Sequence, residues 1–150
     1  MRVLVIDDEP DILGLCSVML AHDGHQVLEA TTADSGLRIA LEESPDLIVL
    51  DLMLPNRDGF SLLEELVATP ATREIPVILL TARVAPQDRA RGWGSGASGY
   101  ITKPFTPAML NETVRVVARM SPEERQRVRD QALSALDPVL KGSPLPTDVL

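Results

Sequence analysis

Carboxylate side chains directly follow two apolar runs of this sequence. Asp7 and Asp8 come after residues 3–6, and Asp51 comes after residues 47–50. If both runs are strands of one parallel sheet, their carboxyl ends meet at the same edge, where sheets of this kind bind ligands. Carboxylates a few ångströms apart repel one another, by on the order of a few kcal/mol for each close pair at an effective dielectric of about 20. A hard divalent cation such as Mg²⁺ is the natural group to offset this repulsion.

A hydroxyl and an ammonium follow two later runs. Thr81 comes after residues 77–80, and Lys103 comes shortly after residues 100–101. Lysine adds a mobile positive charge, and a hydroxyl can bind an equatorial oxygen of a transferred phosphoryl group. A carboxylate beside Mg²⁺ and these two groups can accept a phosphoryl group as an acyl phosphate. We therefore predict that Asp51 is the nucleophile, assisted by the hydroxyl and the ammonium.

Each of these residues also has a purely structural interpretation. Asp8, taken alone, is better explained as a helix cap, because Pro10 and a helical pattern follow it. The run from Asp7 to Glu9 fits a solvated surface, and Thr81 fits a local turn. Their joint placement after separate strands, with no charged residue inside those strands, is hard to explain by structural need alone.

Five apolar runs predict five strands, at residues 3–6, 27–28, 47–50, 77–80 and 100–101. The first, third and fourth are nearly continuous Val, Ile and Leu, which is typical of parallel strands covered on both faces. Segments with helical period separate the strands. The sequence therefore predicts an α/β fold, a doubly wound five-stranded parallel sheet of about 120 residues with helices on both faces.

The helical segments carry apolar stripes. These stripes are Ile12, Leu15, Cys16, Met19 and Leu20; Leu37, Ala40 and Leu41; Leu62, Leu63 and Leu66; and Leu110, Thr113, Val114 and Val117. Pro10 and Pro107 suit the first helical position, and Thr106 can cap the helix that Pro107 opens. The segment 86–91 is the least supported helix, because four glycines crowd residues 92–99 and lower the helix propensity there.

The composition changes after Met120. Residues 121–124, Ser-Pro-Glu-Glu, form a capping box that predicts a sixth helix. Its apolar positions are Val128, Ala132, Ala135, Leu136 and Val139. Pro138 is expected to end this helix near Asp137. The helix could dock on the domain, bind a partner or form part of a linker.

The chain is accordingly divided at residue 120. Residues 1–120 form the predicted domain, and residues 121–150 form a C-terminal extension, the helix followed by a flexible tail. The tail is predicted from Gly142, Pro144 and Pro146. The 30 residues of the extension are too few for a winged-helix effector domain, so we expect either a free-standing unit or part of a longer protein.

Charge and cysteine content narrow the class of protein. The chain has 14 basic and 22 acidic residues, a net charge of −8, and residues 1–120 hold 17 of the acidic and 10 of the basic ones. Without clustered Lys and Arg, no direct binding to nucleic acid is expected. Cys16 is the only cysteine, so it forms no internal disulfide. Because no signal peptide and no apolar run of roughly 18 residues is present, we expect a cytoplasmic protein without a membrane span.

Taken together, these residues resemble the bacterial response regulator receiver domain, over residues 2 to about 119. The resemblance rests on residues 3–10 (VLVIDDEP), 45–55 (PDLIVLDLMLP), 58–59 (DG), 76–82 (PVILLTA), 96–97 (GA) and 100–105 (YITKPF). It implies the flavodoxin-like strand order 2-1-3-4-5. It also implies a phosphorylation-dependent switch without a turnover substrate, whose phosphoryl donor is a sensor histidine kinase or a phosphotransfer protein.

The resemblance assigns roles to individual residues. Asp51 would be phosphorylated, and Asp8, Asp51 and the backbone carbonyl of Met53 would contact Mg²⁺ directly. Asp7 would act mainly through water. Thr81 and Lys103 would hold the phosphoryl oxygens.

Further roles concern the switch. The peptide between Lys103 and Pro104 would be cis. The Thr81 hydroxyl would move toward the phosphoryl group, and Tyr100 would then move inward as the second part of the switch. A half-buried strand residue with a hydrated hydroxyl is the alternative interpretation of Tyr100. Met53 and Arg83 would tune hydrolysis of the phosphorylated state.

Departures and alternatives remain open at this point. Ser98-Gly99 stands where the DNA-binding branch of the family often has an acidic pair that joins a dimer interface, so the oligomeric state is not predicted. An aspartyl phosphatase of the haloacid dehalogenase type would need a second Asp where Met53 stands. A nucleotide-binding domain would need a glycine-rich phosphate-binding motif after the first strand, and none is present there. A pseudo-receiver, which binds partners without phosphorylation, is the alternative function, and the output partner or effector domain is unknown.

Overall fold

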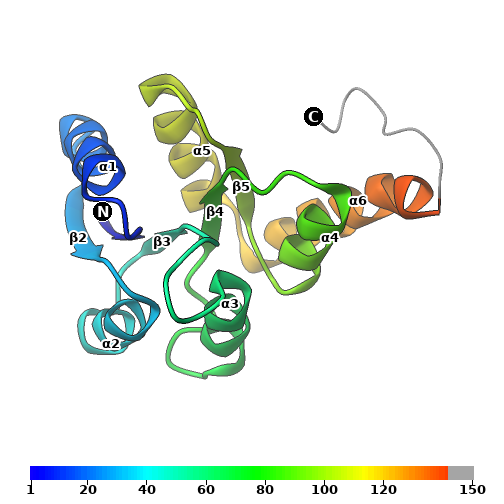
Figure 1. The fold of residues 1–150 in the computed structure, drawn as a ribbon, viewed down its shortest axis with the longest axis horizontal. Helices are drawn as coiled ribbons and strands as arrows, with labels where there is room; N and C mark the ends of the chain where they lie inside the picture. The colour runs from blue at the N-terminus through cyan, green and yellow to red at the C-terminus, as the bar shows by residue number, and fades with distance from the viewer. Residues whose placement is uncertain (142–150) are drawn as a thin grey trace.

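The fold alternates strands and helices and ends in a sixth helix, in a computed structural model that describes residues 1–141 (Figure 1). The strands are β1 (Arg2–Ile6), β2 (Gln26–Ala30), β3 (Leu47–Leu50), β4 (Val77–Thr81) and β5 (Gly99–Thr102). The helices are α1 (Pro10–His22), α2 (Ala33–Glu43), α3 (Gly59–Ala68), α4 (Pro86–Gly94), α5 (Pro107–Arg119) and α6 (Pro122–Leu140). The predicted α/β class is confirmed. Among the described helices, none is both long enough and apolar enough to span a membrane.

All five strands run parallel in one sheet, in the order β2-β1-β3-β4-β5. This order confirms the one implied by the resemblance. The chain goes from β1 outward to β2 and then returns to the other side of β1 to form β3. The winding direction therefore reverses between β1 and β3, and the crevice beyond their carboxyl ends is the expected binding position in such a sheet.

Two apolar cores lie on opposite faces of the sheet. Leu4 and Ile6 pack in the core beneath α2 and α3, whereas Val3 and Val5 pack in the core beneath α1 and α5. Successive residues of a strand point to opposite faces, so a strand covered on both sides is buried throughout. Every residue of β3 and β4 is buried, as the continuous apolar runs predicted. Figure 1 shows α1 and α5 on one side of the sheet and α2 and α3 on the other.

The helix faces differ in part from the prediction. Leu13, Cys16 and Leu20 are the buried residues of α1, whereas Leu15, which was predicted to lie in the apolar stripe, is 45% exposed. In α2, Leu41 is likewise 46% exposed. A stripe with a period of 3.6 residues tolerates a shift to neighbouring positions, so contacts with the sheet decide which side chains are buried.

The helix starts agree with the sequence except at α1. Thr106 caps α5, and the capping box that begins at Ser121 is present at α6. The N-cap of α1 is Glu9 rather than Asp8, and no side chain makes a capping hydrogen bond there. The interpretation of Asp8 as a helix cap is therefore wrong.

The sixth helix is longer than predicted. It continues through Pro138 to Leu140, so the predicted end near Asp137 is wrong. A proline lacks the N–H that would donate to the carbonyl four residues earlier, so α6 forgoes this one hydrogen bond and still continues to Leu140. The backbone N–H of Lys141 closes this end on the carbonyl of Asp137. The predicted tail residues lie outside the described part of the chain: Gly142, Pro144 and Pro146.

The least supported helix, α4, is present and extends to Gly94. Only Gly92 is buried among its residues. A Cβ atom at Gly92 would lie 2.7 Å from Cδ1 of Leu79 in β4. The glycine therefore permits a close approach of α4 to the sheet, and this contact compensates for a low helix propensity.

Gly59→Ala is expected to destabilise the fold by about 3 kcal/mol, because overpacking against rigid backbone is costly. A methyl group at Gly59 would lie 2.6 Å from Cα of Leu52 and 2.9 Å from the carbonyl oxygen of Asp51. Gly14→Ala is the matched control, since Gly14 is exposed in α1 with no atom within 4 Å of the new Cβ. That variant should gain up to about 1 kcal/mol from helix propensity. Urea unfolding measures both, and equal midpoints would contradict this account.

Candidate functional site

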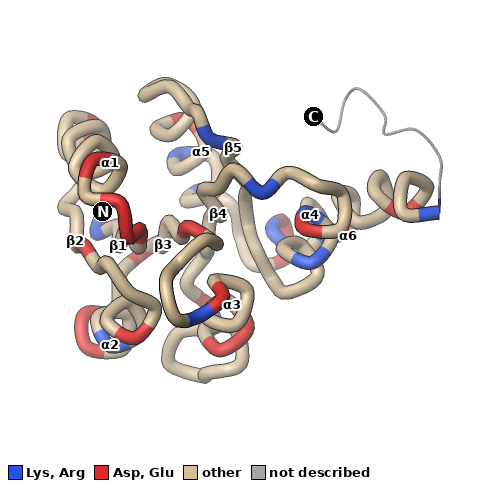
Figure 2. Tube along the Cα trace, viewed as in Figure 1, with Lys and Arg blue, Asp and Glu red and all other residues tan. Residues whose placement is uncertain are grey.

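The ends of β1 and β3 bring two buried carboxylates together. Asp7 follows β1, and its N–H donates to the carbonyl of Ala30 at 3.1 Å. Asp51 follows β3, and its N–H donates to the carbonyl of Ile6 at 2.9 Å. Both residues thus continue the hydrogen bonding of the sheet, which fixes their positions. Their side chains are only 1% and 3% exposed. Figure 2 shows acidic residues gathered at this edge.

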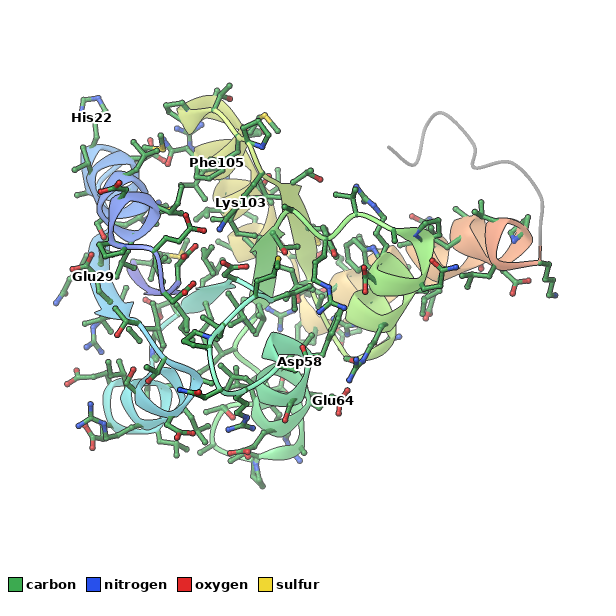
Figure 3. All side chains as sticks on the ribbon, in the orientation of Figure 1. His22, Glu29, Asp58, Glu64, Lys103 and Phe105 are labelled. Carbon is green, nitrogen blue, oxygen red and sulfur yellow. The ribbon has the colours of Figure 1, made fainter. Side chains whose placement is uncertain are left out.

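One ammonium joins the two carboxylates. Nζ of Lys103 lies 3.0 Å from Oδ2 of Asp7 and 3.0 Å from Oδ2 of Asp51. Burial by itself lowers the pKa of Lys103, but the hydrogen bonds to the two carboxylates outweigh it and raise this pKa above its ordinary value. The lysine therefore stays charged and offsets the repulsion between the carboxylates. The peptide between Lys103 and Pro104 is cis, as the resemblance implied, and Figure 3 shows Lys103 following β5.

The second oxygen of each carboxylate holds the loop after its strand. Oδ1 of Asp7 accepts from the N–H of Glu9 at 2.9 Å, and Oδ1 of Asp51 accepts from the N–H of Met53 at 3.0 Å. Burial raises the pKa of Asp7, although the Glu9 N–H and Lys103 act in the opposite direction. The pKa of Asp7 is thus raised mainly by burial, whereas the pKa of Lys103 is raised by its two carboxylate partners.

The carboxylates form a set that fits a hard cation. One oxygen from each of four residues lies within 4.8 Å of the others: Asp7, Asp8, Glu9 and Asp51. Ligands on opposite sides of Mg²⁺ are about 4.2 Å apart, so this set needs little closure to surround the ion. Glu9 was not among the predicted ligands. Its position directly after Asp7 and Asp8 was the signal that could have found it.

The predicted switch residues converge on one backbone segment. Thr81 is fully buried at the end of β4, and its hydroxyl accepts from the N–H of Arg83 at 3.2 Å. Tyr100 lies in β5, and its hydroxyl donates to the carbonyl of Arg83. Tyr100 is half-buried in its strand, as the alternative interpretation expected, and its hydroxyl proton is engaged by this carbonyl. The sequence did not reveal Arg83 as the residue whose N–H and C=O connect the two side chains, because any residue type offers these groups.

A family model described as the response regulator receiver domain matches residues 3–115. The chain belongs to this family. The phosphate regulon transcriptional regulatory protein PhoB of Escherichia coli K12 is 41% identical over 138 residues, which are 91% of this receiver and 60% of PhoB. Protein PilH of Pseudomonas aeruginosa is 34% identical over 116 residues, which are 77% of this receiver and 96% of PilH. The receiver thus spans less than two thirds of the length of PhoB.

Solved structures agree with this assignment. The BeF3-activated N-terminal receiver domain of Klebsiella pneumoniae RstA matches with a TM-score of 0.74 and 28% identity, over 80% of this receiver and all of that chain. Receiver domains are the signalling domains of two-component response regulators. Membership therefore implies phosphorylation-dependent signalling and confirms the family that the sequence motifs indicated.

Lys103→Met is expected to destabilise the receiver by about 3 kcal/mol at neutral pH, because it leaves Asp7 and Asp51 buried without their cation. Mg²⁺ should restore part of that loss. The control is Lys141→Met, which removes the only other lysine; its side chain is 73% exposed beside Asp137, so the change should stay within about 0.5 kcal/mol. Urea unfolding with and without Mg²⁺ measures both variants. A Lys103→Met receiver as stable as the wild type would contradict this dependence on the ammonium.

Proposed function

We propose that this receiver accepts a phosphoryl group on Asp51 from a sensor histidine kinase or a phosphotransfer protein, in a Mg²⁺-dependent reaction. It then signals through Thr81 and Tyr100. The observation that carries the proposal is the position of the Asp51 carboxylate. It is buried where the winding of the sheet reverses, and one of its oxygens lies 3.0 Å from the ammonium of Lys103.

The transfer forms one bond and breaks another. A carboxylate oxygen of Asp51 bonds to the phosphorus of a phosphohistidine on the donor, while the bond from phosphorus to the imidazole nitrogen breaks. The electron pair stays on that nitrogen, and the product on the receiver is an acyl phosphate. Hydrolysis ends the phosphorylated state. A water oxygen bonds to phosphorus, the bond from phosphorus to the Asp51 oxygen breaks, and inorganic phosphate leaves while Asp51 is again a carboxylate. Because the receiver is itself the acceptor, we propose no turnover substrate.

Two side chains hold the phosphoryl oxygens in this proposal. Lys103 already lies beside Asp51 and needs only to exchange part of its contact with the carboxylates for contact with the new oxygens. Thr81 ends the strand next to β3, and its hydroxyl can rotate from Arg83 toward the phosphoryl group. Met53, whose side chain is 59% exposed, and Arg83 flank the site and are proposed to tune hydrolysis.

The chemistry of the donor set supports a magnesium ion at the same edge. The proposed ligands are Asp8, Asp51 and the backbone carbonyl of Met53, with Asp7 acting through water. The oxygens of Asp7 and Asp51 are occupied alike, one by a backbone N–H and one by Lys103, so the indirect role of Asp7 rests on the family resemblance alone. When bound, Mg²⁺ neutralises charge that develops on the phosphoryl oxygens.

The extent and setting of this function are also proposals. Residues 1–120 form the phosphoacceptor domain, because both apolar cores are built from residues within it. Residues 121–150 form an extension. The excess of acidic over basic residues in the domain supports signalling through a protein partner or effector domain rather than direct contact with nucleic acid. A kinase donor that depends on ATP would place the receiver in the cytoplasm.

Asp51→Asn is expected to keep the fold and abolish phosphoryl acceptance, because an amide oxygen is a poor nucleophile. Intact-mass analysis after incubation with acetyl phosphate and Mg²⁺ should show one phosphoryl adduct on the wild type and none on the variant. Asp34→Asn is the control, since the Asp34 side chain is 94% exposed, and it should be labelled like the wild type. Stoichiometric labelling of Asp51→Asn would refute the assignment. A folded wild type without any adduct would favour the pseudo-receiver.

Asp8→Ala is expected to raise the stability of the metal-free receiver and to remove the Mg²⁺ dependence of labelling. Among residues 1–141, no basic side chain forms an ion pair with Asp8, so its charge adds only repulsion until a metal binds. Urea unfolding and Mg²⁺ titration measure the two effects. An unchanged Mg²⁺ affinity in this variant would exclude Asp8 as a ligand.

A further inference from the structure

The helix α6 packs against α4 and is attached outside the two apolar cores (Figure 1). Leu136 is the only fully buried residue of its 19, and it belongs to neither core. Two polar contacts from α6 to the domain are long, 3.4 Å from Arg125 to the carbonyl of Glu74 and 3.5 Å from Arg129 to the carbonyl of Ala97. Hydrogen bonds of this length contribute little. Docking of α6 therefore depends mainly on Leu136, and α6 can detach without opening either core.

A cavity of about 800 Å³ lies between α6 and the surface formed by α4, β5 and α5. Leu136 borders this cavity from α6, Trp93 and Arg89 border it from α4, and Tyr100 borders it from β5. The guanidinium of Arg89 lies 5.0 Å from the centre of the Tyr100 ring. The proposed switch residue and the anchor of α6 therefore line the same space.

Few residues anchor the helix α4 to the rest of the domain, and Trp93, which packs partly buried against the core beneath α2 and α3, is one of them. Gly92 is its only buried residue. On the side toward α3, Arg91 lies 3.6 Å from Asp58 and 3.8 Å from Glu64, in partly exposed ion pairs that contribute little. Figure 3 shows Asp58 at the start of α3, which it caps, and Glu64 on that helix, which lies next to α4. The packing of α6 is thus a substantial part of what holds α4 in place.

A continuous path leads from the phosphoacceptor site to α4. The hydroxyl of Thr81 accepts a hydrogen bond from the N–H of Arg83, and the carbonyl of Arg83 accepts one from the hydroxyl of Tyr100. Arg83 precedes the first residue of α4, Pro86, by three positions. If the Thr81 hydroxyl turns toward a phosphoryl group, it releases the Arg83 N–H, so the segment that begins α4 and the partner of Tyr100 both change.

We infer that α6 is an autoinhibitory cover of the α4 surface, docked through Leu136 in the unphosphorylated receiver and released when Asp51 is phosphorylated. This inference rests on the proposed phosphorylation of Asp51. Coupling between two equilibria is reciprocal. If a phosphoryl group weakens the docking of α6, then a substitution that undocks α6 strengthens the binding of a phosphoryl analogue by the same factor.

The test uses the full chain with beryllofluoride and Mg²⁺. Trp93 is the only tryptophan, so acrylamide quenching of its fluorescence reports on the cavity without any label. Hydrogen exchange of the α6 amides reports docking independently. In the wild type, beryllofluoride should increase both the quenching of Trp93 and the exchange of α6. The fluorine NMR signal of bound beryllofluoride measures occupancy of the site separately from both.

Leu136→Glu should show increased quenching and exchange before any addition, and it should bind beryllofluoride at least about five-fold more tightly than the wild type. Leu136→Ala should change Trp93 quenching, α6 exchange and beryllofluoride affinity in the same direction by smaller amounts. Because this substitution introduces no charge, it keeps the test valid if Leu136→Glu fails to fold. Leu140→Glu is the matched control on the same helix, because Leu140 is 44% exposed, and it should behave like the wild type.

Three results would overturn the inference, and the first is distinguishable from the other two. A wild type that gives no bound fluorine signal would overturn the proposed function and this inference with it. A wild type that binds beryllofluoride while Trp93 quenching and α6 exchange stay unchanged, or decrease, would overturn the release of α6 alone. Equal beryllofluoride affinity in the wild type and in an undocked Leu136→Glu receiver would also overturn it.

Discussion

The ammonium of Lys103 is the contact on which the arrangement of the site depends. It lies 3.0 Å from carboxylate oxygens that follow two different strands, β1 and β3. The strand that it follows, β5, is separated from β3 by β4, which puts roughly 10 Å between β5 and β3 at the usual strand spacing. The lysine therefore has to extend over the end of β4, where Thr81 supplies a small side chain. One cation thus ties together the ends of three strands.

The sequence predicted the strands and the site together because one local pattern defines both. A strand buried on both faces has to be apolar throughout, so the first charged residue after it marks the edge of the sheet. Asp7 and Asp51 are such residues, and both lie at that edge. The apolar runs do not predict the order of the strands, since five buried parallel strands give the same runs in any order. The order was implied by the resemblance to the receiver family.

Side-chain contacts between residues far apart in the chain could not be predicted from the sequence. The stripe of α6 indicated that one face packs, but the sequence did not say that Leu136 packs near α4. Tyr100 sits in an edge strand, from which a hydroxyl can reach either solvent or a neighbouring loop, and only the fold brings the carbonyl of Arg83 within reach. Pro138 was expected to end its helix, but a proline removes a single hydrogen bond to the preceding turn, and α6 continues past it to Leu140.

The receiver separates a rigid part from a movable part, and this separation decides where a signal can travel. The strands β1, β3 and β4 are buried among two close-packed cores, so a shift of their backbone would disturb both. In α4 a single residue, Gly92, is buried, and the segment before it is held by the hydroxyls of Thr81 and Tyr100. A charge added at Asp51 meets the least resistance along that segment, because rotating a hydroxyl and moving a loop disturb few packed atoms. If Asp51 is phosphorylated as proposed, we therefore expect the change to leave the site toward α4, the helix against which α6 packs.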